Sequence, residues 1–103
     1  MKKLSNYNNF DFNRFAQGKE FVIANSRFNE NKGCVSLEVL IMKDASGENL
    51  YEKFKTHLVQ ETTEKAVEKY PIGSRIQFKQ VGKCSVYGEY NANLSVEAIV
   101  EVK

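Results

Sequence analysis

The sequence lacks the residues and runs on which several large classes of protein depend. It has no tryptophan, one proline, one histidine and two cysteines, and no apolar run approaches the roughly 20 residues that a membrane-spanning helix needs. Cys34 and Cys84 form no CxxC pair, so a zinc site with four closely spaced ligands is not expected. We expect two thiols rather than a disulfide, a cytoplasmic protein, and no metal or cofactor.

The chain also lacks a strong net charge. Its 103 residues include 15 basic and 13 acidic side chains, which gives a formal charge of +2. A histone-like or ribosomal composition is therefore excluded, and any contact with nucleic acid has to come from local clusters of Lys and Arg. The hydrophobic share of 42% fits one domain with a modest core.

Motifs for covalent chemistry are missing as well. His57 is the single histidine, and because no Ser or Cys arrangement points to it, we interpret it as structural. The acidic residues lack the spacing of a metal site, and Gly82 and Gly88 are interpreted as turn glycines rather than as a phosphate-binding loop. We therefore expect a protein that is not an enzyme and has no catalytic residue.

Strand-like alternation of apolar and polar residues dominates what is present. The predicted strands cover residues 19–28, 34–42, 74–81 and 94–102. Between the first two, the Asn- and Gly-containing stretch 29–33 predicts a turn, so these strands form a hairpin. Gly82 is expected to end the strand before it, and residues 83–93 to form a polar, aromatic connection.

Two segments in the middle of the chain carry helical features. Residues 51–59 alternate as a strand does, but Leu50, Phe54 and Leu58 also recur every four positions, and of the two we favour the strand. Residues 60–70 predict an amphipathic α-helix that ends at Pro71.

The N-terminal residues 1–18, rich in Asn and Phe, are predicted to be an arm preceding a domain of residues 19–103. The arm either packs on the domain or contacts a neighbour.

The expected order is strand, strand, strand, helix, strand, strand. This is the layout of the OB-fold, a mainly β, five-stranded barrel, here with one α-helix between strands 3 and 4. Five short strands cannot bury both faces of a flat sheet, so closure into a barrel is physically sensible. In such barrels strands 2 and 3 and two loops commonly bind oligonucleotides.

Four stretches share the layout of a known family. They are FKTHLV at 54–59, ETTEKAVEKY at 61–70, IGSRIQF at 72–78 and LSVEAIVEV at 94–102. Together they resemble the bacterial and phage single-stranded DNA-binding proteins, in which a third strand runs into an amphipathic helix and a Gly-Ser-x-apolar strand follows. The resemblance covers the second half of the chain, and residues 19–42 by pattern alone. It implies binding of single-stranded DNA and assembly into a dimer or tetramer.

Two features differ from that family. Its members usually stack bases on tryptophan, which is absent here, and usually carry an acidic tail, whereas this chain stops at Lys103 after the last predicted strand. We therefore expect a phage, plasmid or mobile-element type, with a narrower task in replication or conjugation than the main cellular protein.

Binding a single strand requires cations for the phosphates and flat side chains on which bases stack. The sequence interleaves the two kinds at the first hairpin, in the third and fourth strands, and before the last strand. The predicted nucleic-acid-binding residues are Arg27, Phe28, Lys32, Tyr51, Lys53, Lys55, Arg75, Lys79, Lys83, Tyr87 and Tyr90. Each has a simpler interpretation, because Phe28 also fits the core and an outward Lys often serves solubility alone.

Two functions stay open. The first is sequence-tolerant binding of single-stranded DNA, with RNA as a weaker version. The second is a protein-interaction subunit of a replication, conjugation or phage complex, which the near-neutral charge and the aromatic arm favour. Salt dependence separates them, because phosphate contacts weaken steeply as salt rises. The expected partners are single-stranded DNA, further copies of this chain and replication or transfer proteins, and no membrane.

Overall fold

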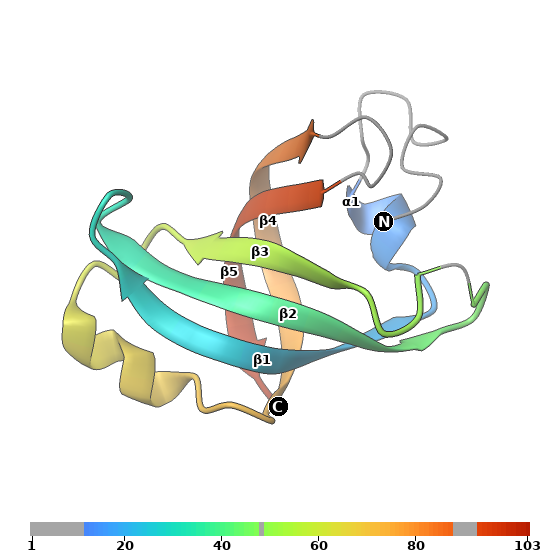
Figure 1. Cartoon of the computed structure of the whole chain (residues 1–103), viewed down its shortest axis with the longest axis horizontal. Coiled ribbons are helices and arrows are strands. Elements are labelled where there is room, and N and C mark those ends of the chain that lie inside the picture. Colours follow the sequence, from blue (N-terminus) through green and yellow to red (C-terminus); the bar gives the residue numbers. More distant parts are fainter. Residues whose placement is uncertain (1–11, 48, 88–92) are drawn as a thin grey trace.

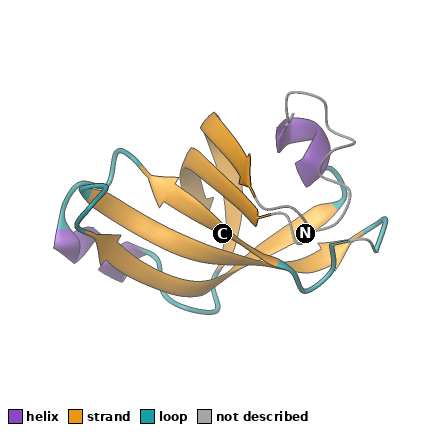
Figure 2. Cartoon of the chain, turned by 45° about the horizontal axis from the view of Figure 1, so that its top comes forward, coloured by secondary structure: helices purple, strands orange, loops and turns teal. Residues whose placement is uncertain are grey.

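The computed structural model describes residues 12–47, 49–87 and 93–103, and for Tyr87 the backbone alone. The strands are β1 (Lys19–Asn29), β2 (Cys34–Asp44), β3 (Lys53–Leu58), β4 (Arg75–Tyr87) and β5 (Asn93–Val102). They close into a barrel in the order β1-β2-β3-β5-β4 (Figure 1). The α-helix α1 (Phe12–Ala16) precedes the barrel, and the 3₁₀-helix η2 (Glu64–Lys69) connects β3 to β4. The two helices lie at opposite ends of the β1-β2-β3 sheet (Figure 2).

Strand pairing confirms the predicted fold class. β1 with β2, β2 with β3, and β4 with β5 are antiparallel, whereas β3 and β5 are parallel. A short antiparallel contact of β1 with β4, where Phe21 lies opposite Ile76, closes the ring. The molecule is therefore a mainly β, OB-fold-like barrel. The predicted first hairpin is confirmed, and so is the strand favoured within residues 51–59.

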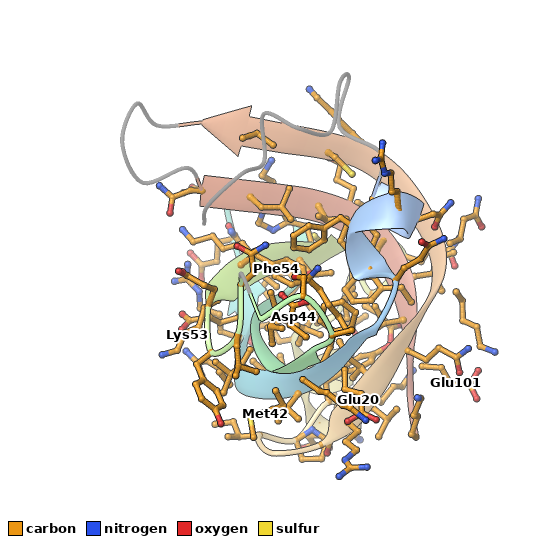
Figure 3. All side chains as sticks on the ribbon, turned by 90° about the vertical axis from the view of Figure 1, so that its right-hand side faces the viewer. Glu20, Met42, Asp44, Lys53, Phe54 and Glu101 are labelled. Carbon is orange, nitrogen blue, oxygen red and sulfur yellow. The ribbon has the colours of Figure 1, made fainter. Side chains whose placement is uncertain are left out.

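Alternation along β2 explains why this strand lies in the middle of the sheet. Val35, Leu37, Val39 and Ile41 are at most 1% exposed. Because successive side chains of a strand point to opposite faces, one face of β2 fills the barrel and the other is left to form a surface. Figure 3 shows the same division on β3, where Phe54 points into the barrel and Lys53 points away from it.

Aromatic rings fill the end of the barrel nearest α1. Phe12 and Phe15, both on α1, are 4% and 0% exposed. The centroid of the Phe12 ring lies 4.8 Å from that of Phe78 and 6.0 Å from that of Phe54. Such ring pairs add about 0.5–1.5 kcal/mol each to the burial of their area. The N-terminal arm was expected either to pack on the domain or to contact a neighbour, and its helix α1 packs on the domain. Residues 1–11 of the arm lie outside the described residues.

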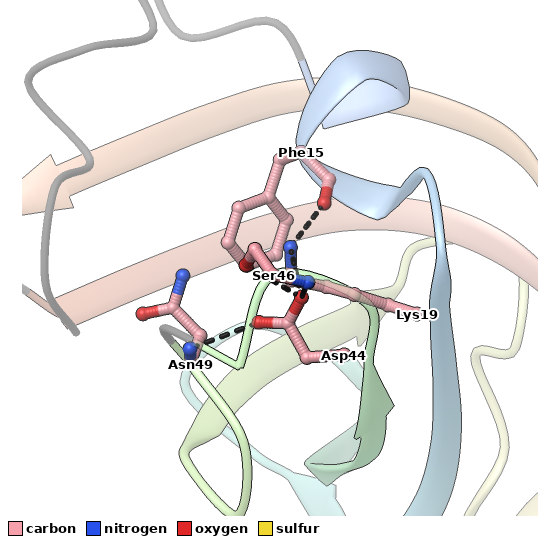
Figure 4. Close-up of polar contacts among 5 residues, drawn as sticks. All are labelled: Phe15, Lys19, Asp44, Ser46 and Asn49. Atoms are coloured by element: carbon pink, nitrogen blue, oxygen red, sulfur yellow. Dashed lines mark hydrogen bonds and ion pairs between the residues drawn. The ribbon is translucent and has the colours of Figure 1, made fainter.

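A buried ion pair, which we call the Lys19–Asp44 latch, fastens α1 to the barrel (Figure 4). Lys19 Nζ lies 3.6 Å from Asp44 Oδ1, and the two side chains are 3% and 1% exposed. The same Nζ donates a hydrogen bond of 2.7 Å to the Phe15 carbonyl, an acceptor at the end of α1. Asp44 also accepts hydrogen bonds from the backbone N–H groups of Ser46 and Asn49, at 3.0 and 2.9 Å. The latch thus joins the end of α1, the start of β1 and the end of β2.

A helix connects β3 to β4 as predicted, but it is shorter than residues 60–70 and is not an α-helix. η2 has six residues, and the hydrogen bonds around it span three residues rather than four. The barrel holds the first part of the segment, because the Glu61 carbonyl accepts the Val35 N–H at 2.9 Å and the Glu61 carboxylate accepts the Tyr70 hydroxyl at 2.6 Å. Contacts with the barrel therefore override the helical pattern of the sequence.

β4 is longer than predicted. It passes through Gly82 and continues to Tyr87, which lies opposite Asn93 on β5. Its register with β5 shifts between Phe78 and Gln80 and again after Val81, where Gly82 falls in the irregular stretch. Glycine is tolerated at such bulges, so it does not end the strand here. Residues 88–92 of the predicted connection lie outside the described residues.

The two cysteines are free thiols, as expected. Cys34 and Cys84 are not joined by a disulfide. Burial raises the pKa of the Cys34 thiol, which therefore stays protonated at neutral pH. In the described part of the chain, none of the helices has the length and apolar character needed to cross a membrane.

Replacing Thr56 by valine is expected to stabilise the barrel. Thr56 on β3 is 0% exposed, and its Oγ1 has no hydrogen-bond partner. An unsatisfied buried hydroxyl costs about 1–3 kcal/mol, and valine has nearly the same shape without the polar atom. We expect the free energy of unfolding in urea to rise by about 1–2 kcal/mol. The exposed Thr62→Val variant is the control and should change it by less than about 0.5 kcal/mol. A loss of stability in Thr56→Val would contradict this account of the core.

Candidate nucleic-acid interface

A groove of about 510 Å³ lies over the outer face of β1, β2 and β3 and reaches β5. It is lined by Asn25, Arg27, Asn29, Lys32, Ser36, Leu37, Glu38, Lys55, His57 and Ser95. With the exception of Leu37, every lining residue is polar or charged. On β2, β3 and β5 the polar lining residues occupy the positions that alternate with the core residues. On β1 a register shift between Ile23 and Asn25 places Asn25, Arg27 and Asn29 on the same outer face.

Strand register arranges the polar residues in two rows across the sheet. In the order β1, β2, β3, β5, the first row is Arg27, Ser36, His57 and Glu97, and the second is Asn25, Glu38, Lys55 and Ser95. Residues directly opposite each other in antiparallel strands have Cβ atoms roughly 4.5–5.5 Å apart. Side chains from four strands are thereby brought within reach of one ligand.

Three cations in the groove form no ion pair with any residue that the structure describes. Arg27, Lys32 and Lys55, which we call the groove cations, are exposed, and within the described ranges none of them forms an ion pair. Some exposed lysines elsewhere are paired, and Lys79 Nζ, for example, lies 3.2 Å from Glu101 Oε2, whereas others, such as Lys65, form no ion pair with a described residue. Unpaired positive charges in a concave surface raise the local potential and attract anions.

A second hollow of about 190 Å³ continues the groove along β3. It shares Glu38 and Lys55 with the groove and adds Lys53 and Asn93. Lys53 Nζ lies 3.3 Å from Glu38 Oε1, so this lysine partly balances the carboxylate that lines the groove. Because Asn93 lies opposite Tyr87, the hollow leads from the groove to the last pair of the β4–β5 hairpin.

His57 lies within the first row and is 6% exposed. Its Nδ1 lies 2.7 Å from Ser36 Oγ, which holds the ring in place and leaves Nε2 as the nitrogen available to a ligand. Burial lowers the pKa of the His57 imidazole, the groove cations lower it further, and Glu97 acts in the opposite direction. The ring is therefore neutral at neutral pH.

A serine beside a histidine is one component of nucleophilic sites. Such sites also need a third group that orients the base through a hydrogen bond. Among the described residues, Ser36 is the hydrogen-bond partner of the His57 ring, and Glu97 acts on the ring through charge. The described residues also contain no group of three or more His, Cys, Asp or Glu that could hold a metal ion. The arrangement is suited to holding a polar, anionic ligand.

Other predicted binding residues of the first three strands lie outside the groove. Phe28 is half-buried against the core, because it occupies the inward side of β1 next to the outward Arg27. Lys53 lies in the second hollow. Tyr51 is 66% exposed in the turn between β2 and β3, where its φ of 64° falls in the left-handed region that non-glycine residues rarely adopt.

The predicted residues of β4 do not line the groove either. Arg75 is exposed and lies opposite Val22 in the closing contact with β1. Lys79 is paired with Glu101, and Lys83 is exposed in the second irregular stretch of β4. The Tyr87 backbone ends β4, and Tyr90 lies outside the described residues.

The uncharged residues of the groove were not predicted from the sequence. Asn25, Asn29 and Ser95 were not predicted as binding residues, and Ser36 and His57 form a pair that no sequence spacing indicates. A signal was present in the period of two, which puts Ser36 on the outward face of the second strand. The cross-strand register that joins it to His57 is not encoded in any local pattern.

Comparison with models of known families, with curated proteins and with solved structures gives no match for this chain.

Proposed function

We propose that the chain binds single-stranded DNA along the groove, in a sequence-tolerant manner and without covalent chemistry. The observation that carries the proposal is the gathering of three cations, none in an ion pair with a described residue, on the outer face of β1 and β3 and in the turn between β1 and β2. Cations that meet phosphates supply affinity that does not depend on sequence. This is also the face of an OB-fold barrel on which oligonucleotides are commonly bound.

The neutral polar residues of the floor support a single strand over a duplex. The side-chain oxygens of Asn25 and Asn29 accept the backbone N–H groups of Ser26 and Lys32, at 2.9 and 3.1 Å, which leaves the amide NH₂ donors and a second lone pair on each oxygen for a ligand. Ser36 Oγ is already paired with His57 Nδ1. The bases of a single strand have free pairing edges that these groups can reach, whereas a duplex hides those edges. Because an amide or a hydroxyl can serve either as donor or as acceptor, the floor suits different bases.

We propose that the bases stack on tyrosines, whereas the family that the sequence resembles usually uses tryptophans. No aromatic ring of Phe, Tyr or Trp is among the described lining of the groove. The second hollow leads to Asn93, whose strand partner is Tyr87, and Tyr90 follows three residues later. Each stacked base contributes about 1–3 kcal/mol.

The resemblance of residues 54–102 supports a role in replication or transfer of a phage, plasmid or other mobile element. It also supports self-association. Several linked grooves on one strand would bind more tightly than one, because each further groove binds at high effective concentration.

A second candidate function is a protein-interaction subunit. Met42 near the end of β2, and Leu50 and Tyr51 in the turn that follows it, are 44%, 37% and 66% exposed. Exposed apolar side chains that lie together are typical of surfaces that contact proteins. Such a contact should depend little on salt.

Fluorescence anisotropy tests the proposal. A labelled dT strand of about 40 nucleotides is long enough for one or more barrels. It should bind at about 50 mM salt and weaken clearly by about 200 mM, and duplex DNA of equal length should bind more weakly. A U strand of the same length measures the preference for DNA. Failure of dT to bind at low salt would contradict the proposal and favour the protein-interaction subunit.

A further inference from the structure

The first row of the groove contains a neutral imidazole that lies between the cations of the groove and Glu97. Arg27 belongs to the same row as His57, and Lys55 lies on the same face of β3 two residues away. Lys32, in the turn between β1 and β2, also acts on the ring through charge. The groove therefore brings three cations and the one histidine of the chain to the same short stretch of sheet.

We propose that the part of the groove around His57 is a phosphate subsite, in which His57 Nε2 and the groove cations hold one phosphate group and His57 takes up a proton as the phosphate binds. The natural ligand of the subsite would be a phosphate of a DNA strand, and this identification rests on the proposed function. Its chemistry is that of any phosphate, so a free phosphate ion is expected to bind in the same place more weakly.

The donors of the subsite match a phosphate. Phosphate oxygens only accept hydrogen bonds, and the planar guanidinium of Arg27 and the ammonium groups of Lys32 and Lys55 only donate them. Protonation of His57 gives the same character to the ring. Whichever neutral tautomer is present, the protonated ring donates from Nδ1 to Ser36 Oγ, 2.7 Å away, and from Nε2 into the groove.

A bound phosphate reverses the electrostatics that act on the ring. In the free groove, burial and the groove cations hold the pKa of His57 below its ordinary value. A phosphate places negative charge beside the ring and offsets those cations, so the pKa of His57 rises in the complex. Because binding and protonation are linked, affinity has to increase as pH falls through the range in which His57 titrates.

The charged and titratable groups that face His57 come from every element around it. They are Arg27 on β1, Lys32 in the turn, Cys34 and Glu38 on β2, Lys55 on β3 and Glu97 on β5. Glu97 opposes the cations, and the Cys34 thiol stays neutral because burial raises its pKa. Since several of these groups also titrate, the decisive readout has to come from the ring of His57 itself.

NMR provides this readout, because a chain with a single histidine has a single imidazole Cε1–H signal. We expect the pKa of His57 to rise by about one pH unit when a dT strand of about 20 nucleotides is bound. Inorganic phosphate, compared with chloride at equal ionic strength, should move it in the same direction by less. An unchanged pKa with dT bound would overturn the subsite and leave the proposed function standing. A rise caused by phosphate in a protein that fails to bind dT would support the subsite and contradict the proposed function.

The variant His57→Gln tests the link to affinity. Glutamine keeps a polar group beside Ser36 but takes up no proton. Between about pH 7.5 and about pH 6, wild-type affinity for dT should increase about threefold to fourfold, whereas that of the variant should change less than about twofold. The control Arg75→Gln, outside the groove, should keep the wild-type dependence. A flat profile of the wild type, or equal profiles of wild type and a folded His57→Gln variant, would overturn the proposal.

Discussion

Replacing Asp44 by alanine is expected to lower the free energy of unfolding by about 3–5 kcal/mol, as removal of one partner of a buried ion pair does elsewhere. Lys19, whose side chain is 3% exposed, would keep its charge in the barrel without the carboxylate 3.6 Å away. The backbone N–H groups of Ser46 and Asn49 would lose their acceptor as well. Urea unfolding measures the loss, and amide exchange should show α1 losing protection first.

The control for Asp44→Ala is Glu20→Ala, which removes an exposed carboxylate that points away from the barrel (Figure 3). This change should stay within about 0.5 kcal/mol. An Asp44→Ala variant that unfolds within about 1 kcal/mol of the wild type would show that the latch does not hold the fold together.

Acid should weaken the latch in the wild type. Burial alone would raise the pKa of Asp44, but hydrogen bonds from Asn49 and Ser46, together with Lys19, outweigh it and lower the pKa below the ordinary 3.8. The unfolded chain therefore binds the proton more readily than the folded one. The contribution of Asp44 is fully present above pH 3.8 and is lost as pH falls through the lower value of the folded state.

Replacing Arg27 and Lys55 together by glutamine is expected to weaken binding of dT about tenfold to a hundredfold at low salt, because two of the three groove cations are lost. On single strands each phosphate contact contributes about −0.7 to the slope of log affinity against log salt, so two lost contacts should flatten it by about 1.4. Anisotropy titrations at several salt concentrations give both values.

The matched control replaces Lys65 and Arg75 by glutamine. Both residues are exposed and lie outside the groove, on η2 and β4, so the net charge changes equally while the groove stays intact. Its affinity for dT should remain within about twofold of the wild type, with the same slope. Equal losses in the two double variants would mean that overall charge, rather than the groove, attracts DNA.

The strands and the barrel could be predicted from the sequence because they depend on local alternation. Val35, Leu37, Val39 and Ile41 point to one face, and Gly33, with a φ of +68°, supplies the left-handed position that the preceding turn needs. The OB-fold layout followed from the number of strands and the place of the helix, since few topologies remain for five short strands with one connecting helix.

The features that could not be predicted depend on contacts distant in sequence. Residues 60–70 have a helical pattern, but Glu61 accepts hydrogen bonds from Val35 and Tyr70. The helix η2 is therefore limited to Glu64–Lys69. The extension of β4 beyond Gly82 depends on a register that tolerates bulges. α1 belongs to the core because Lys19 and Asp44 meet, and no pattern within residues 1–18 indicates that meeting.

The residues predicted for the candidate site likewise include some that the structure brings together and some that it does not. Arg27, Lys32 and Lys55 were predicted from the mixing of cations with aromatic residues, and the structure brings these three together. The same rule also selected Lys79, which is paired with Glu101, and Phe28, which packs on the core. Local composition does not distinguish a groove cation from a paired one, because the distinction depends on how the folded strands place acidic side chains around it.

The central claim is that single-stranded DNA lies along the groove, and mapping of backbone amide shifts in an NMR titration with dT tests it most directly. The account predicts that the perturbed amides gather at residues 25–29 of β1, 36–38 of β2 and 53–57 of β3, and that added salt reverses the changes. Perturbations confined to the turn around Leu50 and Tyr51, or none at low salt, would contradict it.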